Sequence, residues 1–236
     1  MTEYRLWGLI AAAGTGRRMG LAYPKQYHPI AGRPVLAWSV DALLGLREIA
    51  GVMVVRSADD PYFEAALPCR DSRRRDCIGG AERQASVQAG LAALRDWGAD
   101  AADAVLVHDA ARPAVTRADI RRLIDCVADD PDGGLLAAPI RDTLKRADHE
   151  GRAASTPSRD GLWQAMTPQL FPLGRLESAL MMASDAAVTD EAQALERLGA
   201  KPRLVAGDPG NIKYTYPEDA RWLAWALDQQ HAGDRA

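Results

Sequence analysis

The chain has 236 residues, of which 47% are hydrophobic and 26% are charged, and its formal net charge is −3. This composition is typical of a globular protein with a substantial core and argues against a disordered chain. The small negative charge also argues against a nucleic-acid-binding protein, which usually carries a basic domain or face.

The cysteines and the apolar runs give two further expectations. The three cysteines show no Cys-x-x-Cys spacing, which argues against a disulfide framework or a structural zinc site and fits a reducing cytoplasm. No apolar segment is long enough for a signal peptide or a membrane span. We therefore expect a cytoplasmic protein that does not associate with membranes.

Short apolar runs alternate with amphipathic stretches along the chain. The apolar runs predict strands at 6–12, 49–55, 104–107, 135–140, 163–171, 203–206 and 212–215. The amphipathic stretches predict helices at 34–46, 60–68, 82–97, 116–127, 172–183, 189–198 and 217–229, and 70–76 reads as a charged surface segment. This alternation favours an α/β fold with a mainly parallel, Rossmann-like sheet and helices on both faces. We expect one domain over residues 1–236.

A polar stretch at 141–160 interrupts the alternation. It has little apolar content apart from Leu144 and some alanines. A structureless segment of ~20 residues inside a compact domain is usually functional or disordered. Composition alone describes it as a loose loop.

The first predicted strand runs into a loop rich in glycines and cations: Gly14, Gly16, Arg17, Arg18, Gly20 and Lys25. Glycines let backbone N–H groups approach an anion closely, and the cations supply the opposite charge. The dinucleotide pattern G-x-G-x-x-G is missed by one residue, and the G-x-x-x-x-G-K-[ST] phosphate loop is absent. The loop therefore predicts a different nucleoside-triphosphate site, in which Arg18 and Lys25 reach the two ends of the phosphate chain.

Asp109 follows a predicted central strand, within His108-Asp-Ala-Ala-Arg-Pro113. In open α/β sheets ligands gather outside the carboxyl ends of the strands. A carboxylate at that position suits Mg²⁺ bridging nucleotide phosphates. His108 is adjacent and points to the opposite face, so we expect it to be a hydrogen-bonded structural residue.

Two weaker signals come from Gly79-Gly80, which enters a helix containing Ser86, and from Lys213, which follows a Gly207/Gly210 loop. The first could read a base edge or simply start a helix. The second could be a phosphate ligand or a solvated surface lysine. Residue patterns alone leave both questions open.

Taken together, these motifs resemble one family across nearly the whole chain. They are Ala12-Ala13-Gly14-x-Gly16-x-Arg18-Met19, Pro24-Lys25-Gln26-Tyr27, Gly79-Gly80-x-Glu82-Arg83-x-x-Ser86-Val87, His108–Pro113, Asp142-Thr143, Thr167-Pro168-Gln169, Thr189-Asp190-Glu191 and Asn211-Ile212-Lys213. The chain resembles the 2-C-methyl-D-erythritol 4-phosphate cytidylyltransferases. The glycine loop is shared with many nucleotidyltransferases, whereas the later motifs are more specific in combination.

The resemblance implies transfer of CMP from CTP to 2-C-methyl-D-erythritol 4-phosphate, with release of pyrophosphate, in the non-mevalonate route to isoprenoid precursors. It implies catalytic cations at Arg18, Lys25 and Lys213, and a Mg²⁺ ligand at Asp109. It implies that the cytosine and ribose lie against Ala13, Gly14, Gly80 and Ser86. It implies that the acceptor is bound by Arg112, Thr143, Arg159 and Thr189.

The resemblance also gives the 141–160 stretch a meaning. In the family this stretch forms an arm that clasps a second subunit, so a homodimer is expected, with Thr143 and Arg159 serving the partner's site. Alternatives are a cytidylyltransferase for another polyol phosphate such as ribitol 5-phosphate, a sugar-1-phosphate nucleotidyltransferase, and a non-catalytic nucleotide-binding regulator. Retention of the phosphate-facing cations and of Asp109 speaks against the last.

Overall fold

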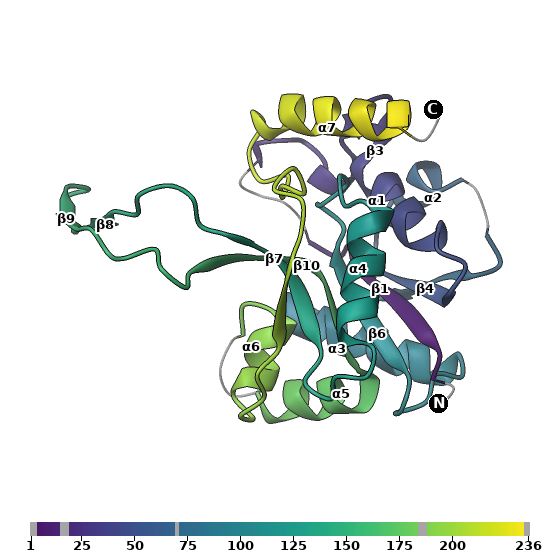
Figure 1. The fold of residues 1–236 in the computed structure, drawn as a ribbon. Coiled ribbons are helices and arrows are strands. Elements are labelled where there is room, and N and C mark those ends of the chain that lie inside the picture. The colour runs from purple at the N-terminus through teal and green to yellow at the C-terminus, as the bar shows by residue number, and fades with distance from the viewer. Residues whose placement is uncertain (1–3, 15–18, 69–70, 184–187, 234–236) are drawn as a thin grey trace.

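A seven-stranded sheet forms the centre of the molecule in the computed structural model, which describes residues 4–14, 19–68, 71–183 and 188–233 (Figure 1). The strand order is β11-β7-β10-β6-β1-β4-β5. Their bounds are β1 (Leu6–Ala11), β4 (Ile49–Arg56), β5 (Arg74–Ile78), β6 (Ala104–Asp109), β7 (Gly134–Pro139), β10 (Trp163–Pro172) and β11 (Arg203–Ala206). Among the described residues, the neighbouring strands of this sheet are parallel except for β10, which runs antiparallel to β6 and β7. The prediction of a mainly parallel α/β sheet is confirmed.

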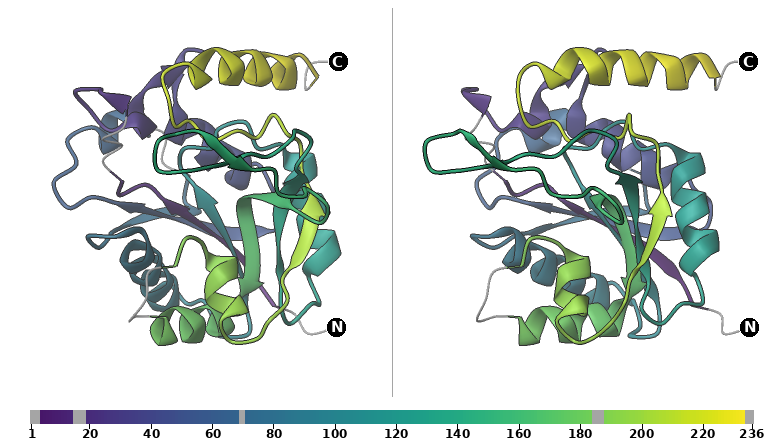
Figure 2. Two further views of the ribbon diagram at one scale, coloured as in Figure 1. Left: turned by 90° about the vertical axis from the view of Figure 1, so that its left-hand side faces the viewer. Right: turned by 60° about the vertical axis from the view of Figure 1, so that its left-hand side comes forward.

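Helices cover both faces of the sheet (Figure 2). One face packs against α1 (Val35–Leu44), α2 (Phe63–Ala66) and α4 (Arg117–Val127). The other packs against α3 (Arg83–Asp96), α5 (Leu173–Met182) and α6 (Glu191–Glu196). A last helix, α7 (Asp219–Gly233), lies at one end of the molecule over a small hairpin of β2 (Pro29–Ile30) and β3 (Arg33–Pro34).

The period-two alternation of strand side chains divides the core into two layers. In β1, Ile10 packs into the cluster beneath α1 and α4, whereas Leu9 packs into the cluster beneath α3 and α5. Both are fully buried. Because the central strands are covered on both sides, they read as continuous apolar runs in the sequence.

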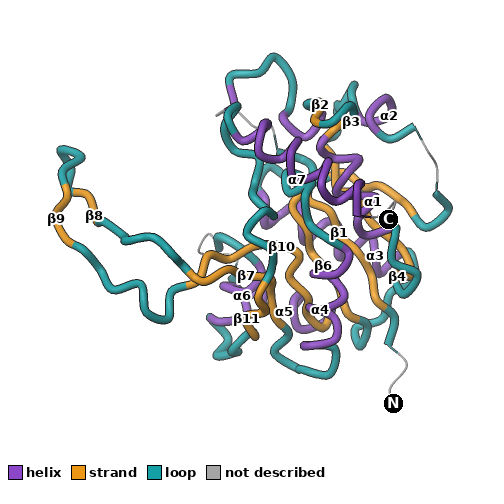
Figure 3. Tube along the Cα trace, turned by 45° about the horizontal axis from the view of Figure 1, so that its top comes forward, coloured by secondary structure: helices purple, strands orange, loops and turns teal. Residues whose placement is uncertain are grey.

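The 141–160 stretch lies between β7 and β10 and projects away from the body of the molecule (Figures 1 and 3). Near its tip it forms a short antiparallel pair, β8 (Arg146–Ala147) and β9 (Ala153–Ser155). Most of its residues are exposed. The polar composition follows from this exposure, since side chains surrounded by water gain nothing from being apolar.

The local predictions missed one strand and placed another where none forms. Residues 71–76 lie at the surface, as expected, but Arg74–Ile78 also forms β5, which pairs with β4 at the edge of the sheet. Its charged side chains hide the strand pattern, and charges are common on edge strands because they discourage pairing with another chain.

The strand predicted at 212–215 is wrong, because the backbone forms no strand there. Ile212 and Tyr214 instead pack into the cluster beneath α7, and the Tyr214 N–H donates to the carbonyl of Ala111 at 2.8 Å. The apolar alternation is therefore satisfied by packing rather than by a sheet ladder.

Over the residues that the structure describes, no helix has both the length and the apolarity that crossing a bilayer requires. Cys77 and Cys126 are free thiols.

A buried carboxylate, Asp103, ties the start of β1 to the loop before β6. It accepts from the Arg5 N–H at 2.8 Å, from the Trp7 indole at 2.9 Å and from the Asp100 N–H at 2.9 Å. Burial by itself raises the pKa of Asp103, but these donated hydrogen bonds outweigh it and hold the pKa below its usual value. The ionised form therefore stabilises the folded state above the unfolded pKa, and this contribution is lost as the pH falls through the folded pKa.

We predict that Asp103→Asn lowers the free energy of unfolding by about 1–3 kcal/mol at neutral pH, because an amide cannot accept all three hydrogen bonds. The deficit relative to the wild type should shrink on acidification, as the wild type loses the same contribution. Urea unfolding at neutral and acidic pH checks this, with Asp125→Asn on the exposed side of α4 as the matched control. Equal stability of the two variants would contradict it.

Candidate active site

A cleft of about 590 Å³ opens at the carboxyl ends of β1 and β6. Ala11 and Asp109, the last residues of these strands, pair with each other in the register of the sheet. The cleft is lined by Ala11, Ala12, Ala13, Gly14, Met19, Lys25, Gln26, Gly80, Ala81, Glu82, Arg83, Ser86, Asp109, Ala110, Ala111, Lys213 and Thr215. The described residues predicted for the nucleotide and the catalytic cations thus meet in one place.

The loop after β1 forms one wall of the cleft. The buried amide of Gln26 donates to the carbonyls of Ala12, at 2.7 Å, and of Gly14, at 3.0 Å, and so fixes the start of the loop. Lys25 begins the short helix η2 (Lys25–Tyr27), and its Nζ donates to the Tyr214 carbonyl at 2.5 Å. Arg18 lies outside the described residues.

The Gly79-Gly80 turn forms another wall of the cleft, next to the loop after β1. The Gly79 N–H donates to the Arg56 carbonyl at 2.8 Å, and the Ser86 hydroxyl donates to the Gly80 carbonyl at 3.2 Å. A Cβ on Gly79 would lie 2.7 Å from Ser86 Oγ and 2.9 Å from Ala13 Cβ. Only glycine therefore lets this turn approach the loop after β1.

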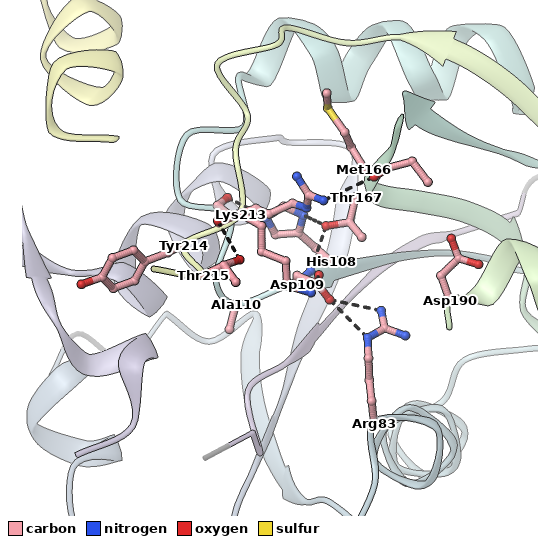
Figure 4. A network of polar contacts seen from close by, with 12 residues as sticks. Arg83, His108, Asp109, Ala110, Met166, Thr167, Asp190, Lys213, Tyr214 and Thr215 are labelled. Carbon is pink, nitrogen blue, oxygen red and sulfur yellow. Dashed lines mark hydrogen bonds and ion pairs between the residues drawn. The ribbon is translucent and has the colours of Figure 1, made fainter. Parts of the chain in front are cut away.

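Asp109 is the centre of a charged network on the floor of the cleft (Figure 4). Its Oδ2 accepts from Lys213 Nζ at 2.6 Å, and its Oδ1 lies 3.2 Å from Arg83 Nη2 and 3.3 Å from Arg83 Nε. Arg83 also forms a two-pronged pair with Glu191, at 2.5 Å and 2.9 Å. Four charged groups from β6, α3, α6 and the 211–215 segment therefore meet at the end of β6.

The network holds both Asp109 and Arg83 in their charged forms. Burial alone raises the pKa of Asp109, but the charges of Arg83 and Lys213 outweigh it and lower that pKa well below its usual range. Burial likewise lowers the pKa of Arg83, and the carboxylates of Glu191 and Asp109 reverse that effect and raise it. Asp109 is therefore an anion over the whole physiological range of pH.

His108 fulfils the structural role expected for it. It is fully buried; its Nε2 lies 3.1 Å from the Arg112 carbonyl and its Nδ1 lies 3.0 Å from Thr167 Oγ1. Since a carbonyl only accepts, Nε2 carries the proton and Nδ1 accepts from the hydroxyl. Burial lowers the pKa of His108 to about 4, which agrees with a neutral ring. Thr167 also accepts from the Asp109 N–H at 3.0 Å, so this chain of contacts fixes the backbone of Asp109.

The residues predicted for the acceptor are more widely separated. Arg112 is 6% exposed and donates to the carbonyls of Asn211, at 2.7 Å, and Ala165, at 3.4 Å. Thr189 is exposed just before α6, two residues ahead of Glu191. Thr143 and Arg159 are exposed on the arm, where Arg159 donates to the Arg141 carbonyl. These four residues do not line the cleft of their own chain.

Sequence reasoning assigned no role to Gln26, Arg83 or Glu191, although all three lie in the quoted motifs. Gln26 follows Lys25 directly, and Arg83 begins α3 after the glycine turn, so each had a local signal. Glu191 had no such local signal in the sequence. An acidic residue in the first turn of a helix is ordinarily explained by its interaction with the helix dipole, so it does not indicate a site.

A divalent cation suits Asp109 through the chemistry of its donor. Among the described residues, His, Cys, Asp and Glu side chains do not gather in a group of three or more that would cage a metal. Mg²⁺ usually keeps several waters and binds through one or two carboxylates together with substrate phosphates. An ionised, cleft-lining Asp109 fits that mode, provided that the cation replaces one of its present contacts.

Comparisons with known proteins identify one family over most of the chain. The family model described as "IspD: 2-C-methyl-D-erythritol 4-phosphate cytidylyltransferase" matches residues 6–227. The protein of that name from Pseudomonas putida (strain GB-1) is 50% identical over 93% of this chain and 95% of its own length. The protein of that name from Halorhodospira halophila is also 50% identical, over 97% of this chain and 96% of its own length.

Solved structures agree as well. A crystal structure of 4-diphosphocytidyl-2C-methyl-D-erythritol synthase is 37% identical, with a TM-score of 0.84 over 96% of this chain and 100% of that one. The Francisella tularensis cytidylyltransferase is 30% identical, with a TM-score of 0.81 over 94% and 100%. By sequence and by fold, this chain belongs to the IspD family of 2-C-methyl-D-erythritol 4-phosphate cytidylyltransferases.

Proposed function

We propose that this chain transfers CMP from CTP to 2-C-methyl-D-erythritol 4-phosphate, giving 4-diphosphocytidyl-2-C-methyl-D-erythritol and pyrophosphate in the non-mevalonate route. The observation that carries the proposal is the convergence of Lys25, Lys213 and Asp109 on one cleft, between the loop after β1 and the Gly79-Gly80 turn. Family membership supports the choice of nucleotide and acceptor.

A pyrophosphate-release panel tests this function. Four nucleoside triphosphates are each paired with the phosphates of methylerythritol, ribitol and erythritol. We expect the highest kcat/KM for CTP with methylerythritol phosphate. A maximum for ribitol phosphate would assign a different acceptor, and nucleotide binding without pyrophosphate release would leave only a binding protein.

The chemical problem is electrostatic. The acceptor's phosphate oxygen is already anionic near neutral pH, so it attacks the α-phosphorus without a protein nucleophile, and pyrophosphate leaves on the opposite side. An anion must therefore approach a polyanion, and fixed cations offset the repulsion and hold the two in line. Lys25 and Lys213 both line the cleft and supply such charges, and we assign Arg18 to the same task.

The remaining cleft residues bind and orient the nucleotide. The Ala13 and Gly14 backbone, the Gly80 turn and Ser86 would surround the cytosine and ribose. Asp109, with its low pKa, would hold Mg²⁺ against the phosphates. When bound, the cation neutralises phosphate charge and orients the leaving group.

We predict that Lys25→Ala and Lys213→Ala each lower kcat/KM on the order of 10²–10³-fold, the loss typical of removing one donor to a developing charge. CTP-dependent pyrophosphate release gives the rates. Thermal unfolding serves as the control, because the fold should persist. Near wild-type turnover would remove that lysine from the mechanism.

We assign acceptor binding to Arg112, Thr143, Arg159 and Thr189, and we propose that the arm at 141–160 clasps a second copy of this chain. The exposure of Thr143 and Arg159 on a projecting arm, away from the cleft of their own chain, supports their action in the partner's site. Arg112 would contribute a fixed buried charge from beneath the acceptor.

Mixing subunits tests the arm. The Arg159→Ala and Lys25→Ala homodimers should each have little activity, but a mixed dimer has one site with an intact Lys25 and an intact Arg159 from the partner. Equal mixing with random exchange should restore about a quarter of wild-type activity, from the symmetry of a two-site dimer. Exchange is verified with differently tagged subunits. No recovery after proven exchange would place Arg159 in its own chain's site.

A further inference from the structure

Glu191 is an acid buried beside the cleft that the mechanism above does not use. It is 1% exposed and lies in the first turn of α6. Both of its carboxylate oxygens are engaged by Arg83, at 2.5 Å and 2.9 Å. A buried carboxylate of this kind needs a charged partner, because removing an ion from water is costly.

The contacts of Arg83 are unequal. Its two bonds to Glu191 have the length and two-pronged geometry of strong guanidinium–carboxylate pairs. Its contacts to Asp109, at 3.2 Å and 3.3 Å, are longer and converge on a single oxygen, Oδ1. Glu191 is therefore the main anchor of this guanidinium, and Asp109 is the weaker partner.

The other oxygen of Asp109 is held differently. Oδ2 lies 2.6 Å from Lys213 Nζ, a short charged contact. Among the described residues, Oδ1 has only the long contacts to Arg83, so it is the oxygen whose present contacts a cation entering the cleft would replace most easily. Its availability depends on how firmly Arg83 is held elsewhere.

We infer that Glu191 is a positioning residue, which holds Arg83 back from Asp109 and so keeps Oδ1 available to the divalent cation that arrives with the nucleotide. Without the charge of Glu191, Asp109 would be the remaining carboxylate bound to Arg83, and the guanidinium would move onto Oδ1 and compete with the cation. The inference rests on the metal role proposed for Asp109.

The test measures how strongly Mg²⁺ and CTP binding are coupled, by calorimetric titration of CTP with saturating Mg²⁺ and with EDTA. No acceptor is present, so no turnover occurs. The ratio of the two Kd values is compared between variants, because the binding of Mg²⁺ to free CTP is the same for all of them. Direct effects of a side chain on CTP appear in both titrations and cancel in the ratio.

Glu191→Gln should reduce this coupling roughly tenfold, equivalent to about 1.4 kcal/mol. The double variant Arg83→Gln/Glu191→Gln should return the coupling to the wild-type value or above it, because the competing cation is gone. Glu196→Gln, an exposed residue on the same helix, is the matched control and should change nothing.

The outcomes separate the inference from the metal role. Unchanged coupling in Asp109→Asn would reject the proposed metal ligand. Reduced coupling in Asp109→Asn, together with unchanged coupling in Glu191→Gln, would overturn the inference alone. A double variant no better than Glu191→Gln would also overturn it, since it would indicate a general disturbance of the fold rather than competition by Arg83.

Discussion

The attraction between one buried carboxylate and the cations around it organises this molecule. Asp109 ends β6, and its two oxygens face Lys213 and Arg83, which come from segments far apart in the chain. Two cations that contact the same carboxylate would repel each other if that anion were absent. The same carboxylate therefore holds Lys213 and Arg83 together and also suits the divalent cation of the proposed reaction.

The sheet provides the fixed frame for this charge cluster. Because β1 and β6 pair in parallel, their carboxyl ends meet, and the loop after β1 lies beside Asp109. The antiparallel β10 lies beside β6, and Thr167 on that strand accepts from the Asp109 N–H. The arm leaves the sheet between β7 and β10, so the strand that supports Asp109 also continues into the segment proposed to reach a partner.

Much of the architecture could be predicted from the sequence. The central strands were recognised because strands buried on both faces are continuously apolar, as in β1 and β6. The helix predicted at 116–127 is present as α4, and the Thr116 hydroxyl caps it by accepting from the Asp119 N–H at 3.0 Å. The edge strand β5 was missed because its exposed, charged side chains carry no such pattern. The 212–215 strand was wrongly predicted because an apolar alternation is the same whether it packs against a helix or pairs in a sheet.

For the site, the sequence by itself determined the chemical inventory: glycines and cations after the first strand, a carboxylate at the end of a central strand, and the set of motifs that marks the family. These are local patterns, and local patterns can be read along a chain. Tertiary structure alone decided the pairings, namely that Arg83 is held by Glu191, that Lys213 closes on Asp109, and that Arg112 turns toward buried carbonyls. Such pairs are separated by about a hundred residues in sequence, and whether a charge is solvated or paired depends on burial, which only the folded chain defines.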